Sequence, residues 1–106
     1  MAGYALAKIS ATDAVKRGGS LVDVRKAAAR TASGQQVRGA QWIDPFALSH
    51  GHDVLNQTDL IFYCVHGHEV SQFACALARI HGVDAAYVEG GFEALVAAGA
   101  ALESAE

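Results

Sequence analysis

The feature that most constrains the fold is an unbroken run of four large apolar residues at 60–63, Leu-Ile-Phe-Tyr. Apolar and polar residues do not alternate in it, which is typical of a strand with both faces buried. Such a strand belongs to a parallel sheet that carries helices above and below. The segment that follows agrees, because its apolar residues at 70, 73, 74, 77 and 80 recur on one face of a predicted helix over 70–80.

Short strand and helix patterns alternate along the rest of the chain. We expect strands at 4–8, 21–24 and 85–88, an extended segment at 37–43, and helices at 11–17, 26–31, from Pro45 onward and at 92–98. Ser10 and Asp13 have the spacing of a helix N-cap. The alternation predicts a single α/β domain over 1–106, with a central parallel sheet, helices on both faces and a frayed tail at 100–106.

The composition limits the classes of function. The chain has 106 residues, 52% hydrophobic and 18% charged, which is enough apolar material for one core. Its net charge is -3 and its basic residues do not cluster, so we expect no nucleic-acid partner. No apolar stretch approaches the ~18 residues of a membrane span, and no signal-peptide pattern is present, so we expect a cytoplasmic protein without a membrane partner. In that reducing compartment Cys64 and Cys75 are expected to be free thiols.

The junction after the central strand is the predicted functional site, because ligands of parallel sheets bind where strands end and helices begin. Cys64 ends the strand, and a tight loop with Gly67 leads into the next helix. Amides of such a loop, with the positive end of the helix dipole behind them, bind anions and favour a thiolate or persulfide at Cys64. On the residues alone, Cys64 can equally be a small buried residue that closes the strand.

Four segments in order resemble a rhodanese-like domain, a single-domain sulfurtransferase family. Residues 21–25 resemble its Leu-Ile/Val-Asp-Val-Arg segment, and residues 36–40 its His-Ile-Pro-Gly-Ala segment. Residues 61–64 and the following loop are similar to the active-site strand and loop, and residues 89–92 to the closing Glu-Gly-Gly turn. Arg38 departs from the pattern, because proline is usual at its position. The resemblance covers nearly the whole chain.

The resemblance implies a rhodanese-type (thiosulfate) sulfurtransferase that has no cofactor and no metal. Cys64 would accept sulfane sulfur from thiosulfate or another persulfide donor and pass it to a thiol or to cyanide. A six-residue active-site loop would hold the persulfide; after Cys64 it comprises Val65, His66, Gly67, His68 and Glu69. Asp23 and Arg25 would brace the site. Related phosphatases and arsenate reductases have a loop one residue longer that ends in arginine, which this chain lacks.

The loop departs from thiosulfate-using members, many of which carry basic residues there. This chain has Val65 directly after the cysteine and Glu69 at the end of the loop. The Glu69 carboxylate would repel a dianionic donor, unless protonated His66 and His68 offset it. We therefore expect a neutral or protein-borne persulfide to be a better donor than thiosulfate. The expected acceptor is a thiol, for example that of a thioredoxin-like protein, and the sequence leaves the oligomeric state open.

A second hypothesis keeps the fold without the catalysis. The loop also resembles rhodanese-like domains associated with chromate resistance, so the chain could be a sensing or binding module for a metal or a metal oxyanion. Five nitrogen or sulfur ligands are available for such a site: His50, His52, Cys64, His66 and His68. Paired Cys-x-x-Cys signatures are absent, and exposed loop histidines explain the same pattern. Cys75, in an apolar helix segment, is expected to pack in the core rather than act as a resolving thiol.

Overall fold

A five-stranded parallel sheet with β5 at its centre organises the molecule. The computed structural model describes residues 8–17, 20–49, 59–66 and 69–105. Within them the strand order is β1-β6-β5-β2-β4, and every pairing is parallel. The strands are β1 (Lys8–Ile9), β6 (Ala85–Val88), β5 (Leu60–Tyr63), β2 (Ser20–Asp23) and β4 (Gln41–Trp42). The predicted central parallel sheet is confirmed, with the apolar run at its middle.

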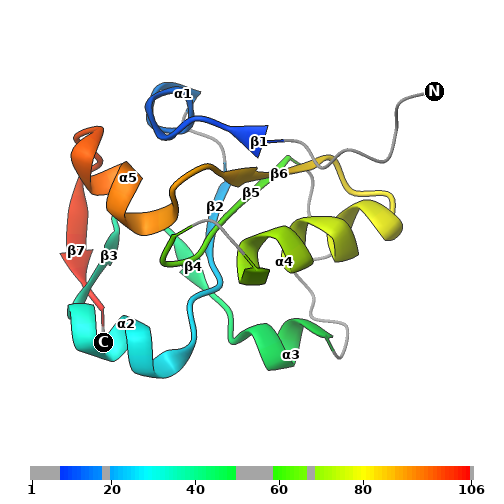
Figure 1. Ribbon diagram of the computed structural model, residues 1–106, viewed down its shortest axis with the longest axis horizontal. Helices are drawn as coiled ribbons and strands as arrows, with labels where there is room; N and C mark the ends of the chain where they lie inside the picture. The colour runs from blue at the N-terminus through cyan, green and yellow to red at the C-terminus, as the bar shows by residue number, and fades with distance from the viewer. Residues whose placement is uncertain (1–7, 18–19, 50–58, 67–68, 106) are drawn as a thin grey trace.

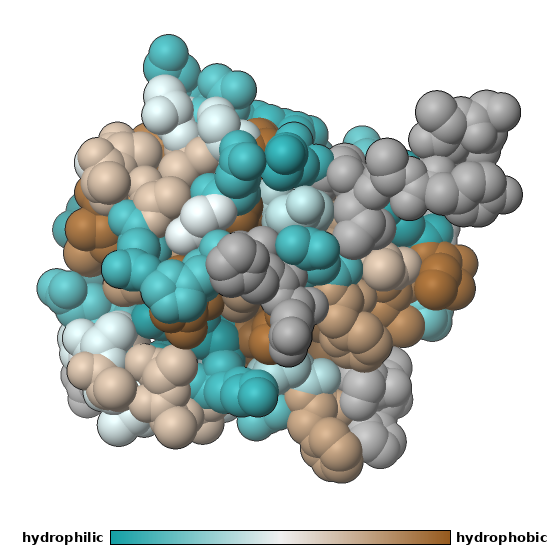
Figure 2. Space-filling model, viewed as in Figure 1, coloured by the Kyte–Doolittle hydropathy of each residue, from teal (hydrophilic) through white to brown (hydrophobic). Residues whose placement is uncertain are grey.

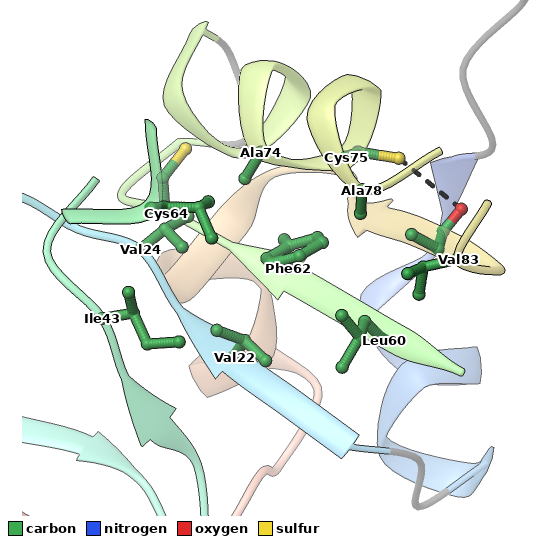
Figure 3. Packing of buried hydrophobic residues seen from close by; sticks show 12 residues of the cluster. Val22, Val24, Ile43, Leu60, Phe62, Cys64, Ala74, Cys75, Ala78 and Val83 are labelled. Atoms are coloured by element: carbon green, nitrogen blue, oxygen red, sulfur yellow. Dashed lines mark hydrogen bonds between the residues drawn. The ribbon is translucent and has the colours of Figure 1, made fainter. Parts of the chain in front are cut away.

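Helices cover both faces of this sheet, which explains why β5 has no polar residue (Figure 1). On one face, Ile61 and Tyr63 pack with residues of α1 (Ala11–Arg17) and α5 (Gly91–Ala97). On the other face, Leu60 and Phe62 pack with residues of α3 (Pro45–Ser49) and α4 (Glu69–Ile80) (Figure 3). Successive strand residues point to opposite faces, so each of the four finds an apolar environment. The predicted helices on both faces are confirmed.

The local signals at helix ends are also confirmed. The Asp13 amide donates to Ser10 Oγ at 3.1 Å, as an N-cap requires, and α1 begins directly after Ser10. α2 (Ala27–Ser33) ends at Gly34, whose φ of 68° is the left-handed conformation that glycine adopts without strain. Pro45 is the first residue of α3, where its fixed φ suits a helix start.

The rotation of α4 differs from the prediction. Phe73 is 48% exposed and Ile80 is 80% exposed, so two members of the predicted apolar face point to solvent. The fully buried residues of the helix are small: Ser71, Ala74, Cys75 and Ala78. These residues recur at the same helical spacing and let the helix approach the sheet closely, which large side chains would prevent. Apolar surface is accordingly visible over α3 and α4 (Figure 2).

Residues 102–105 are part of the described fold, which contradicts the prediction of a frayed tail at 100–106. β7 (Leu102–Ser104) pairs antiparallel with β3 (Gln35–Val37), and the Arg38 amide donates to the Ala101 carbonyl at 2.8 Å. Gln36 Nε2 also donates to Glu103 Oε2 at 2.7 Å. The pairing supplies the backbone hydrogen bonds that a tail would leave to water. The extended segment expected at 37–43 contains the last residue of β3, a turn and β4, whereas β3 itself begins earlier, at Gln35.

Two further predictions concern the edges of the described chain. The first strand is seen at Lys8–Ile9, and the rest of the predicted strand at 4–8 lies outside the described residues. Across the described ranges, every helix is too short or too polar to cross a membrane.

Candidate active site

Cys64 directly follows β5, at the ends of the parallel strands. Backbone hydrogen bonds from two other segments hold Tyr63 and Cys64 in place. The Phe92 amide at the start of α5 donates to the Cys64 carbonyl at 2.7 Å, and the Val24 amide donates to the Tyr63 carbonyl at 2.9 Å. Gly90 and Gly91, with φ of 82° and 62°, form the turn that brings Phe92 there. The chain segments after β2, β5 and β6 therefore meet at this cysteine, as the strand-end rule predicts.

The Cys64 thiol contacts the first turn of α4 through a residue that the sequence did not single out. Its Sγ donates to Ser71 Oγ at 3.1 Å, and Ser71 is completely buried. In Figure 3 the Cys64 sulfur is directed toward the start of α4. A hydroxyl can also donate, so the same Oγ–H can stabilise a thiolate or a persulfide on Cys64. The sequence offers one signal for Ser71. It is a polar residue at the helical spacing of the small residues that α4 buries, Ala74, Cys75 and Ala78.

A cavity of about 410 Å³ opens beside this sulfur. Cys64 is only 6% exposed, and it is one of the residues that line the cavity. The other described lining residues are Arg25, Lys26, Ala29, Val65, His66 and Val70. The volume lies within the ~300–1,000 Å³ typical of small-molecule pockets. A nucleophilic sulfur at this position can attack a small sulfur compound that enters the cavity.

Asp23 and Arg25 form a buried ion pair beneath the site. The Arg25 guanidinium donates to both carboxylate oxygens of Asp23. Its Nε is 3.0 Å from Oδ1 and 3.1 Å from Oδ2, and its Nη2 is 2.7 Å from Oδ2. It also donates to Ser33 Oγ at 3.0 Å and the Gln35 carbonyl at 2.7 Å, and it stacks 4.2 Å over the Phe92 ring. The pair thus joins the ends of β2 and α2 to the start of α5, and the role at the site that the resemblance implies for it stays a prediction.

Tyr63 completes this layer under Cys64. Its hydroxyl oxygen accepts a hydrogen bond from the Val37 amide at 3.2 Å. Burial, and then the negative charge of Asp23, raise the pKa of Tyr63 well above its ordinary value. The phenol is therefore neutral at physiological pH, and it serves as a structural contact between β5 and β3.

The loop after Cys64 is described in part. Val65 is half-buried, and exposed His66 pairs through Nδ1 with Glu93 Oε2 at 2.5 Å. Gly67, His68 and the Glu69 side chain lie outside the described residues, so the predicted cradle of amides from 65 to 69 stays a prediction. Among the described residues no group of three or more potential metal ligands is present. His50 and His52 are likewise outside the described chain, so the alternative metal site stays a hypothesis.

Cys75 is separate from this site. It is completely buried in α4, and its Sγ donates to the Ala85 carbonyl at 3.5 Å. Figure 3 shows the sulfur atoms of Cys64 and Cys75 pointing in different directions. The predicted core-packing role of Cys75 is confirmed.

Comparisons with solved structures show the same fold. A rhodanese-related protein of Thermoplasma volcanium superposes with a TM-score of 0.77 at 19% identity, over 92% of this chain and 97% of that one. A rhodanese-like domain protein of Staphylococcus aureus gives 0.72 at 24% identity, over 95% and 100%. A thiosulfate sulfurtransferase of Pseudomonas aeruginosa gives 0.78 at 22% identity, over 96% of this chain and 20% of that one.

Sequence comparisons identify the family. A search of curated protein sequences gave no match. Residues 2–98, however, match the sequence profile of the rhodanese-like domain. The profile spans nearly the whole chain and includes every element that surrounds Cys64. The chain therefore belongs to the rhodanese-like domain family.

Proposed function

We propose that the protein is a sulfurtransferase that carries sulfane sulfur as a persulfide on Cys64. The Cys64 thiolate attacks the outer sulfur of a donor, a sulfur–sulfur bond forms on Sγ, and the donor's own sulfur–sulfur bond breaks. The leaving group departs with the electron pair as sulfite from thiosulfate, or as a thiolate from an organic persulfide. A thiol or cyanide then attacks the outer sulfur and regenerates the Cys64 thiolate.

The observation that carries this proposal is the position of the Cys64 sulfur. It lies at the end of a buried strand, lines a cavity of about 410 Å³ and has a buried hydroxyl within hydrogen-bond distance. Cys75 belongs to the same apolar cluster as Cys64 and contacts a carbonyl, but it does not line this cavity. Membership of the rhodanese-like family and the likeness to a thiosulfate sulfurtransferase support the same reaction.

The donor, the acceptor and the compartment are part of the proposal. Thiosulfate or a persulfide serves as donor, and the acceptor is a small thiol or the thiol of a thioredoxin-like protein. The five residues after Cys64, from 65 to 69, supply the backbone that holds the persulfide anion. A reducing compartment such as the cytoplasm suits the reaction, because Cys64 must return to a free thiol after each transfer.

The direct test is intact-mass measurement after incubation with thiosulfate or glutathione persulfide. We expect wild-type protein to gain one sulfur atom and to lose it again when cyanide is added. Cys64→Ser should gain none. Cys75→Ala is the matched control, because it removes the other thiol, which lies in the core and points away from the site. Absence of the gain in wild type, or an equal gain in Cys64→Ser, contradicts the proposal and leaves a binding module on this fold.

A further inference from the structure

The walls of the cavity beside Cys64 are largely apolar, although the sulfur donor that gives the family's best-known activity is a small dianion. Ala29 of α2, Val65 after Cys64 and Val70 of α4 supply aliphatic surface. These residues come from three separate segments of the chain. Thiosulfate has no carbon and can gain nothing from such walls, because only apolar surface benefits from burial there.

Charge in the cavity is sparse and lies on defined residues. The Arg25 guanidinium is occupied by Asp23, Ser33 and the Gln35 carbonyl, so its charge is balanced within the protein. His66 pairs with Glu93. Lys26 is exposed at the N-terminal end of α2 and also lines the cavity. Among the described lining residues, Lys26 supplies an ammonium group, and Ala29, Val65 and Val70 supply aliphatic surface.

We propose that this cavity selects an organic sulfane-sulfur donor, with an apolar group against Ala29, Val65 and Val70 and an anionic group near Lys26. The proposal rests on the sulfurtransferase function above and names its substrate class. The structure shows Cys64 as a free thiol, which is the state that reacts with a donor. In the reaction the Cys64 thiolate takes the terminal sulfur of R–S–SH, and R–S⁻ leaves with the electron pair, so no oxidant or reductant is needed.

Thiosulfonates provide stable probes for this selectivity. In methanethiosulfonate and benzenethiosulfonate the same terminal sulfur is transferred and a sulfinate leaves, so the two donors differ chiefly in apolar surface. Burial of the aryl ring should make kcat/KM for benzenethiosulfonate about tenfold higher or more, with cyanide as the common acceptor. The ratio of the two values is the readout, because it cancels changes in the amount of active protein.

Variants on α2 test where the ring binds. Ala29→Phe places a ring in the cavity and should bring the ratio of the two donors down toward one. Ala28→Phe is the matched control, because Ala28 is exposed on the same helix and does not line the cavity, so the ratio should stay at its wild-type value. Lys26→Gln should lower kcat/KM for 4-carboxybenzenethiosulfonate severalfold relative to benzenethiosulfonate, which lacks the carboxylate.

The outcomes separate this inference from the function on which it rests. Equal kcat/KM for the methyl and phenyl donors, or the same fall in the ratio in both alanine variants, overturns the inference while sulfur transfer itself stands. No transfer from any donor in wild type, judged by thiocyanate formation and by intact mass, overturns the sulfurtransferase function. A preference that survives Ala29→Phe places the aryl group outside this cavity and also overturns the inference.

Discussion

Replacement of Ser71 by alanine tests whether its contact with Cys64 supports the proposed reactivity of that cysteine. The change removes a hydroxyl that is 3.1 Å from Sγ and leaves the rest of the helix intact. A hydrogen bond to a charged group contributes about 1.5–3 kcal/mol, and 1.4 kcal/mol corresponds to a tenfold change in rate. If the Ser71 hydroxyl donates to the reacting sulfur anion, sulfur loading of Ser71→Ala should be about 10- to 100-fold slower than that of wild type.

The assay is the rate of Cys64 alkylation by iodoacetamide, followed by mass spectrometry in parallel with the rate of sulfur loading. Both rates should fall by a similar factor, because both depend on the anionic sulfur. Ser10→Ala is the matched control, since it also removes a serine hydroxyl, and Ser10 does not line the cavity. Loss of this α1 N-cap should lower the free energy of unfolding by about 1 kcal/mol. Wild-type rates in Ser71→Ala, or an equal slowing in Ser10→Ala, would refute the reasoning.

Two further predictions concern the buried layer under the site. Asp23→Asn should lower the free energy of unfolding by about 3–5 kcal/mol in urea titration, because it leaves the Arg25 charge buried without its counter-ion; wild-type stability would show that the pair does not brace the fold. Folding raises the pKa of Tyr63, so the phenol binds its proton more tightly in the native state than in the unfolded state. Its contribution to stability is therefore complete below about pH 10 and is lost as the pH rises above that value. Tyr63→Phe should therefore show a smaller loss of stability between about pH 10 and 12, and an unchanged loss would contradict the assignment.

Much of the fold could be read from local sequence. The unbroken run at 60–63 indicated a strand buried on both faces, and the alternation of strands and helices predicted a parallel sheet, but the order of its strands came only from the structure. The ends of several helices depend on one residue each, such as Ser10, Gly34 and Pro45, because caps and backbone conformations are set by side chains within a few positions. The position of Cys64 after the central strand follows from the same local order.

Tertiary structure decided which residues meet. The antiparallel pairing of β7 with β3 joins segments 67 residues apart, and neither strand has an alternating pattern that would predict it. The rotation of α4 depends on which face fits closely against the sheet, so the small residues were buried while Phe73 and Ile80 remained exposed. That rotation also turns Ser71 toward Cys64. The sequence by itself determined where strands and helices form, because those preferences are local. The cavity and the contact of Ser71 with the Cys64 sulfur arose only when distant segments packed together and steric fit determined which face of α4 was buried.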